Sequence, residues 1–216
     1  MALRISKTSK LDGVRSWSLQ ARETCPGSID PATGDLVPAC QGCYAAFGNY
    51  RFANVKAPRE ENREDWKRDE WVNDMIHALR NDRYFRWFDS GDVYDVRLAK
   101  KIYLVMLNTP HCQHWLPTRM HKFAKFKGIL AAMDALPNVA VRRSSDSVTG
   151  EFDPAIHGST ILPDTSPRAG VTICHAAFNN GECGACRACY SKDVPMIGYV
   201  AHGRVMAKVL REQLAA

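Results

Sequence analysis

The stretch "YFRWFDSGDVYDVRLAKKIYLVMLN", residues 84–108, places a compact aromatic run directly before a helical pattern. Aromatic side chains favour strands, so the first nine residues predict a strand that ends at Ser-Gly-Asp. Apolar side chains then recur at the spacing of one helix face, at Leu98, Ile102, Val105 and Met106. This stretch therefore predicts one strand followed by one helix with a buried side.

The same alternation of patterns continues along the chain. Helices are predicted at 58–81, 96–108, 121–136 and 204–214, and strands at 84–92, 113–119, 138–146, 159–163 and 169–176. Alternating strands and helices imply a parallel sheet joined by right-handed crossovers. With about five to six strands, we expect an α/β fold that is either an open doubly wound sheet or an incomplete barrel.

The composition predicts one domain. A chain of 216 residues with 45% hydrophobic content can bury one substantial core. Within it we distinguish a cysteine-bearing N-terminal region (1–58), a βα core (59–176) and a cysteine-rich C-terminal segment (177–216). No long apolar run predicts a membrane span, and the N-terminus lacks the apolar region of a secretory signal. We therefore expect a cytoplasmic protein, in which clustered cysteines bind metal more often than they form disulfides.

Charge and aromatic content leave several partners open. The net charge of +6 permits nucleic acid or another polyanion as a partner. Tryptophan side chains could stack on bases, but we expect a place in the core for Trp66, Trp71, Trp87 and Trp115. The sequence contains no GxxxxGK[ST] phosphate loop and no HExxH helix, so nucleotidase and metallohydrolase activities have no support.

The stronger of two cysteine groups lies near the C-terminus. Its run CxxCxxC at 183–189 resembles the runs that hold [4Fe–4S] clusters. With one upstream cysteine it can supply four thiolates to one centre, from Cys174, Cys183, Cys186 and Cys189. Zinc is the alternative metal, because four thiolates also satisfy a tetrahedral structural site. Zinc sites usually pair two CxxC units, so the three-in-a-row spacing favours the cluster.

The N-terminal group consists of Cys25, Cys40 and Cys43. Three thiolates leave one metal position unfilled, which is what a catalytic cluster needs. One alternative is a zinc site completed by a histidine or by Cys112. Another is a single zinc ribbon in which Cys40 and Cys43 pair with two C-terminal cysteines. If Cys112 is not a ligand, we expect it to be a buried thiol.

Polar residues follow four of the predicted strands, at 89–92, 118–119, 144–146 and 174–175. Ligands of parallel sheets bind at the carboxyl ends of the strands. Any one of these residues could be an ordinary loop or helix-capping residue, but together they predict a site at one rim. Arg119 and the pair Arg142-Arg143 are placed either for an anionic ligand or for ion pairs with the aspartates of this rim.

Five motifs occur in order over most of the chain: "CPG" at 25–27, "ACQGCYA" at 39–45, "YRFANV" at 50–55, "YFRWFDSGDVYD" at 84–95 and "CGACRACY" at 183–190. With them the chain resembles the gene product 88 family of phages and actinobacteria. That family in turn resembles a reduced relative of the radical S-adenosylmethionine (SAM) enzymes. The resemblance implies a partial parallel (β/α) barrel.

The resemblance also implies a ligand set. Cys25, Cys40 and Cys43 would hold a SAM-binding [4Fe–4S] cluster, with Tyr44 beside it. The usual radical SAM loop has a short first gap, whereas fourteen residues separate Cys25 from Cys40 here. Because the entropy of loop closure grows slowly with length, the longer loop can still bring Cys25 to the same iron.

The contacts to SAM follow from the same resemblance. Ser90, Gly91 and Asp92 would take the place of the Gly-Gly-Glu segment that meets the amino group of SAM. Asp92 would act as the acceptor, and Ser144 or Asp146 would reach the ribose hydroxyls.

We hypothesise an iron–sulfur protein that reduces SAM by one electron, giving methionine and a 5′-deoxyadenosyl radical. The radical would take a hydrogen atom from an unknown substrate, for which a nucleotide or nucleic acid is one candidate. An electron donor is then a required partner, and the C-terminal cluster would fix its segment or relay an electron. The alternative is a non-enzymatic module that binds nucleic acid or protein and is held by zinc or closed clusters, or a redox protein.

Overall fold

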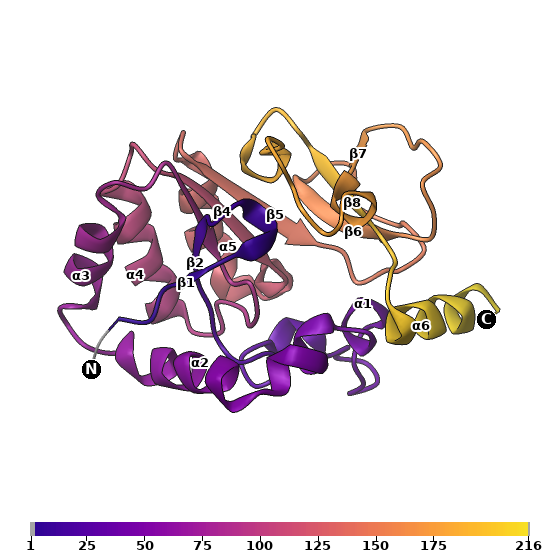
Figure 1. The fold of residues 1–216 in the computed structure, drawn as a ribbon, viewed down its shortest axis with the longest axis horizontal. Coiled ribbons are helices and arrows are strands. Elements are labelled where there is room, and N and C mark those ends of the chain that lie inside the picture. Colours follow the sequence, from indigo (N-terminus) through magenta and orange to yellow (C-terminus); the bar gives the residue numbers. More distant parts are fainter. Residues whose placement is uncertain (1–2, 216) are drawn as a thin grey trace.

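The computed structural model describes residues 3–215, which form one sheet flanked by helices (Figure 1). The strands are β1 (Ser6–Lys7), β2 (Arg15–Trp17), β3 (Tyr84–Trp87), β4 (Gln113–Thr118), β5 (Val139–Ser144), β6 (Gly158–Leu162), β7 (Val171–Ile173) and β8 (Met196–Val200). The α-helices are α1 (Pro38–Gln41), α2 (Ala53–Asp65), α3 (Trp71–Leu79), α4 (Val96–Leu107), α5 (Ala124–Ala135) and α6 (Arg204–Leu214). None of the helices in this part of the chain is long and apolar enough to cross a membrane.

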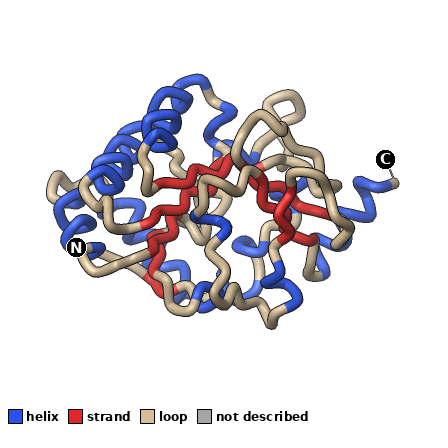
Figure 2. The backbone as a smooth tube through the Cα atoms, turned by 90° about the horizontal axis from the view of Figure 1, so that it is seen from above, coloured by secondary structure: helices blue, strands red, loops and turns tan. Residues whose placement is uncertain are grey.

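The sheet is mostly parallel and open. Its strand order is β1-β2-β3-β4-β5-β6-β8-β7, and only the β1–β2 pair is antiparallel. From β2 to β6 each new strand is added on the same side of the sheet. In Figure 2 the strands follow an arc, with most of the helices along its outer side. The expected α/β class is confirmed, and the described sheet is not closed, since β1 and β7 are its edges.

The sheet has eight strands where the sequence predicts five or six. The strands β1, β2 and β8 were not expected. β2 has three residues, too few to show an alternating pattern, and it is placed by pairing with β3, where Ser16 lies opposite Arg86. β8 lies within the cysteine-rich segment, after its last cysteine, and inserts between β6 and β7.

The predicted helix at 58–81 is wrong, because the structure has two helices, α2 and α3, in its place. The side chain of Lys101, on α4, reaches the carboxyl end of α2 and donates to the carbonyls of Trp66 (3.0 Å), Lys67 (3.4 Å) and Arg68. A cation at this end satisfies carbonyls that have no partner within the helix. The contact comes from a distant part of the chain, so helical periodicity alone does not reveal the break.

The main core lies between the helices α3, α4 and α5 and one face of β2–β5. Three buried tryptophans form its centre, with ring centroids 5.3 Å apart for Trp17–Trp71 and 6.3 Å for Trp17–Trp87. Trp66, Trp71, Trp87 and Trp115 are all buried, as expected for core residues, and so is the thiol of Cys112.

The opposite face of the sheet carries polar side chains, because neighbouring residues of a strand point to opposite faces. Phe85 and Trp87 belong to the core, so Arg86 between them lies on this second face. The cysteine-rich segment covers part of it, where Tyr190 packs edge-on against Tyr84 (5.1 Å) and Trp115 (5.8 Å).

His114 is a buried polar group inside the main core. Its Nδ1 accepts from Trp87 Nε1 (3.2 Å), so its proton lies on Nε2, 2.9 Å from Thr109 Oγ1. Burial lowers the pKa of His114 to about 3. The native state therefore holds a neutral imidazole at pH values where the unfolded chain binds a proton.

We expect the free energy of unfolding to fall as the pH is lowered from 7 to 5. The unfolded histidine takes up a proton near pH 6.5 whereas the native one does not, which removes about 2 kcal/mol over this range. The variant His114→Gln should lack this loss in denaturant titrations, and His202→Gln, at an exposed site, should keep it. The same pH dependence in His114→Gln and the unchanged protein would contradict the assignment.

Candidate metal and cofactor site

The first cysteine group is brought together by a small hairpin. Residues 29–36 turn back on themselves through the Ile29–Leu36 bridge, and Val37 N donates to Ser28 O (2.9 Å) at its base. Cys25 therefore lies near α1, which carries Cys40, although fourteen residues separate the two in sequence. Cys43 follows in the next turn, where its N–H donates to Cys40 O (3.3 Å).

The thiols of the first group lie close enough to change the pKa of their neighbours. Burial, then the charge of Asp92, and then Cys40 and Cys43 raise the pKa of Cys25 to about 12. The pKa of Cys40 is raised by burial and partly lowered by Arg119. The thiols of Cys25 and Cys40 therefore favour the protonated form, and the positive charge of a bound metal would favour their thiolates instead.

Two glycines let the backbone around these cysteines pack closely. A Cβ on Gly27 would lie 2.6 Å from Arg119 Cβ and 2.8 Å from Arg119 O, so the Cys-Pro-Gly turn rests directly on the end of β4. A Cβ on Gly42, between Cys40 and Cys43, would lie 2.8 Å from Met206 Cα. The first turn of α6 therefore lies directly against the CxxC loop, and Figure 1 shows α1 and α6 side by side.

The predicted segment Ser90, Gly91 and Asp92 is bound to the residues that precede Cys25. Ser90 Oγ donates to Leu19 O (2.7 Å), and Asp92 N donates to Thr24 O (3.1 Å). Gly91 has a φ of +79°, and a Cβ there would lie 2.7 Å from Leu19 Cβ. The segment therefore positions the first cysteine group as well as bordering it.

The Asp92 carboxylate is buried and largely satisfied. It accepts from Val93 N (2.7 Å), Thr118 Oγ1 (2.7 Å) and Arg119 N (2.8 Å). A carboxylate has about four acceptor positions, and Oδ2 receives only one of these three bonds, so one position remains for a ligand. Burial raises the pKa of Asp92, while these three donors lower it.

The ends of β4 and β5 form an ion-pair network. Arg119 Nε lies 3.2 Å from Asp146 Oδ1, Lys122 Nζ lies 2.7 Å from Asp146 Oδ2, and Arg119 Nη2 donates to Ser145 O (2.9 Å). Arg119 thus forms the ion pair with a rim aspartate that was one of its two expected roles. Asp146 is held beside Cys40, because its carbonyl accepts from Ala39 N (2.9 Å).

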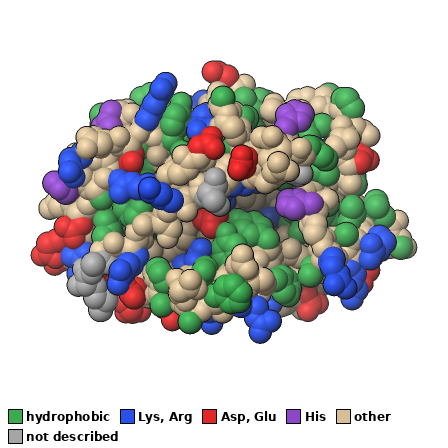
Figure 3. Space-filling model, viewed as in Figure 1, with side chains coloured by type: hydrophobic (Ala, Val, Ile, Leu, Met, Phe, Trp, Pro, Cys, Tyr) green, Lys and Arg blue, Asp and Glu red, His purple; other side chains and the backbone are tan. Residues whose placement is uncertain are grey.

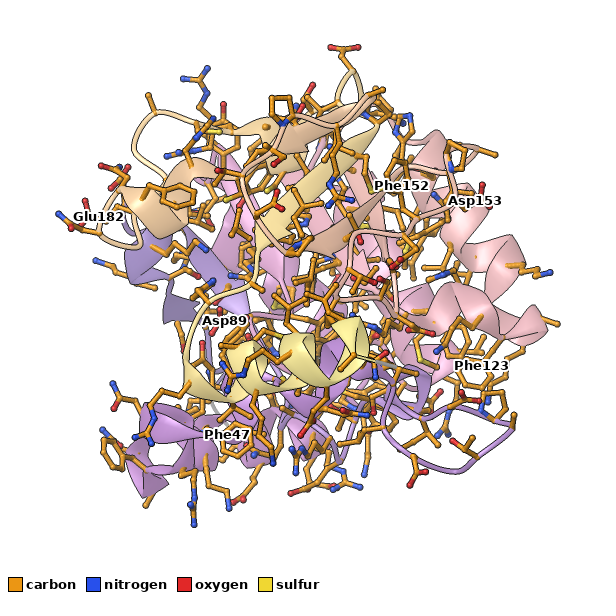
Figure 4. The ribbon with its side chains drawn as sticks, turned by 90° about the vertical axis from the view of Figure 1, so that its right-hand side faces the viewer. Phe47, Asp89, Phe123, Phe152, Asp153 and Glu182 are labelled. Carbon is orange, nitrogen blue, oxygen red and sulfur yellow. The ribbon has the colours of Figure 1, made fainter. Side chains whose placement is uncertain are left out.

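A cavity of about 190 Å³ adjoins this network. Ser144 and Asp146, both predicted to contact a cofactor, line it together with Lys122, Phe152 and Ile156. Figure 4 shows Phe152 and Asp153 on the opposite half of the molecule from Asp89.

The second cysteine group lies over the second face of the sheet. Cys174 N donates to Gly198 O (2.7 Å), Cys183 N donates to Lys10 O (2.8 Å), and Cys189 Sγ lies 3.4 Å from Tyr199 OH. Burial, with the nearby Cys174, raises the pKa of Cys189 to about 11. Cys174 and Cys186 both raise the pKa of Cys183, and Cys174 also raises that of Cys189. The four predicted thiols therefore lie close to one another.

Arg142 holds this segment in place. Arg142 is 1% exposed, and its guanidinium donates to five backbone carbonyls of the C-terminal segment, those of Ala188 (3.0 Å), Cys189 (3.2 Å), Ser191, Val194 and Pro195 (3.3 Å). Arg143 points to the other face and pairs with Asp134 of α5 (3.1 Å). Neither arginine pairs with a rim aspartate, which was one expectation for both.

No three His, Cys, Asp or Glu side chains among residues 3–215 form a group that could hold a metal ion as they stand. Three residues that were not predicted for the site surround the rim residue Asp89: Arg86 on β3, Arg59 on α2, and Tyr50 in the turns after Cys43. The signal for Arg86 was present, because it alternates with the apolar Phe85 and Trp87 in a predicted strand.

A family model described as gene product 88 matches residues 3–192, which include both cysteine groups, the Ser-Gly-Asp segment and the sheet up to β7. The chain belongs to the gene product 88 family. No curated protein and no solved structure matches it. β8 and α6 lie beyond the part of this gene product 88 protein that the family match covers.

We expect Arg142→Met to lower the free energy of unfolding by about 3 kcal/mol or more, because it leaves buried carbonyls without donors. Arg143→Met should cost about 1 kcal/mol or less, because its ion pair with Asp134 is partly exposed. Denaturant titration of both variants measures the difference. Equal losses in the two would show that the five carbonyl contacts do not hold the segment.

Proposed function

We propose that this gene product 88 protein is an iron–sulfur enzyme that cleaves SAM reductively and modifies an unknown substrate. The observation that carries the proposal is the hairpin at 29–36, which brings Cys25 near Cys40 and Cys43 although fourteen residues separate Cys25 from Cys40 in sequence. Each cysteine group contributes thiols only. In each group, neighbouring cysteines raise the pKa of a thiol, of Cys25 in the first group and of Cys183 in the second. This donor chemistry fits an iron–sulfur cluster in each group.

Cys25, Cys40 and Cys43 would hold a [4Fe–4S] cluster, and three thiolates would leave one iron open to SAM. The cluster would supply the one-electron reduction of SAM, which would yield methionine and, after transfer of a hydrogen atom from the substrate, 5′-deoxyadenosine. The electron comes from an external donor, and a cytoplasmic location would keep the thiols reduced.

The residues of the rim would orient SAM. The remaining acceptor position of Asp92 suits its amino group, and Arg119 has a guanidinium nitrogen left for its carboxylate. Ser144 and Asp146 would meet the ribose hydroxyls from the wall of the cavity that they share. Tyr44, next to Cys43, would border the cluster.

The fold is in keeping with this proposal. The consecutive order of β2 to β6 and the open sheet support a partial (β/α) barrel, in which ligands lie at the carboxyl ends of the strands. The second group would hold a cluster through Cys174, Cys183, Cys186 and Cys189, closed to substrates because all four ligands are thiolates. Its position over the sheet suits a structural role or an electron relay.

We expect anaerobic reconstitution to give about eight irons per chain, two [4Fe–4S] clusters, and SAM to change the EPR spectrum of the reduced protein. Cys40→Ala should lose about four irons and the SAM effect, because it opens the first group. Cys112→Ala, at a buried thiol outside both groups, is the matched control and should keep both.

The other outcomes assign different functions. About four irons with no response to SAM would exclude the SAM reaction and leave a structural or redox cluster. Zinc without iron would favour a module that binds nucleic acid or protein. Full iron content in Cys40→Ala would contradict the assignment of the first group.

A further inference from the structure

Arg86 is a buried cation on the second face of the sheet. It is 9% exposed, and its guanidinium lies over the ring of Trp115, 4.5 Å from the centroid. Nη1 lies 3.0 Å from Asp89 Oδ1, and Nη2 lies 3.4 Å from Tyr44 OH. Its Nε is buried and has no hydrogen-bond partner.

Asp89 is shared between two arginines. Arg59 Nη2 lies 3.5 Å from Asp89 Oδ2, and Tyr50 OH donates to the same oxygen. The side chains of Arg59, Arg86 and Asp89 are only 12%, 11% and 17% exposed. Burial keeps Tyr50 uncharged by raising its pKa. Two positive charges thus share one negative charge in a place largely shielded from water.

Buried charges are normally paired, because an unpaired one loses its hydration without compensation. The cluster therefore has one positive charge in excess and one guanidinium donor, Arg86 Nε, without an acceptor. An oxyanion would supply both the missing charge and the missing acceptor. Arginine suits this task because its planar fork of donors matches carboxylate and phosphate groups.

The cluster lies between the two cysteine groups. Tyr44, which follows Cys43, donates to Asp89 O (2.7 Å), and Trp115 beneath Arg86 packs against Tyr190, which follows Cys189. In Figure 4 Asp89 lies above Phe47, and Glu182 of the cysteine-rich segment lies above Asp89 and to its left. The face drawn in Figure 3 is hollowed near its middle.

We propose that Arg86, supported by Arg59, binds a small oxyanion, a carboxylate or phosphate group of the substrate, between the two cysteine groups. The aromatic rings of Trp115 and Tyr44 flank the position and would pack against the rest of the molecule. That the oxyanion belongs to the substrate rests on the proposed function. The binding of an oxyanion at Arg86 does not depend on that function.

The test measures anion binding by the purified full-length chain without SAM. Sodium phosphate and sodium acetate are titrated separately at constant ionic strength set with chloride, and affinity is taken from calorimetry and from the shift in Tm. We expect one of the two anions to bind measurably more tightly than chloride, and the tighter one identifies the group. Arg86→Gln should weaken that binding about tenfold or more, since a charge-assisted hydrogen bond and the positive charge are lost.

Two controls separate a site from a general charge effect. Arg97→Gln removes the same charge from an exposed position and should change the affinity less than about twofold. Arg86→Lys keeps the charge but loses the fork and should also bind more weakly. If Arg86→Gln does not fold, as judged by circular dichroism, Arg59→Gln takes its place and should weaken binding about threefold or more.

Absence of binding above chloride, or equal affinities in the Arg86→Gln and Arg97→Gln variants, would overturn the proposal. So would an unchanged affinity in Arg59→Gln where that variant is used. Since the titration needs neither iron nor SAM, anion binding that depends on Arg86 would support the site even if SAM leaves the EPR spectrum unchanged. A SAM effect without anion binding would overturn the anion site alone.

Discussion

Asp92 connects three segments that are distant in sequence. Its buried carboxylate accepts from Thr118 Oγ1 and Arg119 N at the end of β4, and its backbone N–H donates to Thr24 O, just before Cys25. A buried carboxylate is costly unless its hydrogen bonds are made, so these segments cannot move independently. Arg119, fixed in this way, supports the turn at Gly27 and pairs with Asp146. Asp92 therefore helps to fix the position of the first cysteine group relative to the end of β4.

The elements from β3 to β7 and the C-terminal helix α6 could be predicted from the sequence, whereas β1, β2, β8 and the break between α2 and α3 could not. The elements β3, α4, β4, α5 and β5 all lie within their predicted ranges, because each shows a clear apolar pattern over several residues. β2 has only three residues and exists because β3 provides a partner. The gap between α2 and α3 depends on Lys101, which approaches from α4. Contacts of this kind arise from tertiary structure and leave no local pattern.

In the candidate site, the cysteines could be predicted from the sequence, and the roles of the arginines could not. The spacing of the cysteines predicts two groups of thiols, and in the structure the thiols of each group lie near one another. The roles of the arginines are harder to predict from the sequence, because Arg86, Arg142 and Arg143 all lie in strands and look equivalent there. The structure gives Arg142 five carbonyls, Arg143 an aspartate on a helix, and Arg86 an aspartate that it must share. Their roles depend on partners supplied by other segments.

The hairpin at 29–36 closes on itself, and the residues at its base, Ser28 and Val37, are hydrogen-bonded to each other. The distance in space between Cys25 and Cys40 is therefore set by the base of the hairpin and not by the number of residues in it. Evolution can lengthen or shorten such a hairpin without moving the thiols. A pattern search that demands a fixed number of residues between these cysteines will overlook proteins with the same arrangement, whereas one that allows this gap to vary will find them.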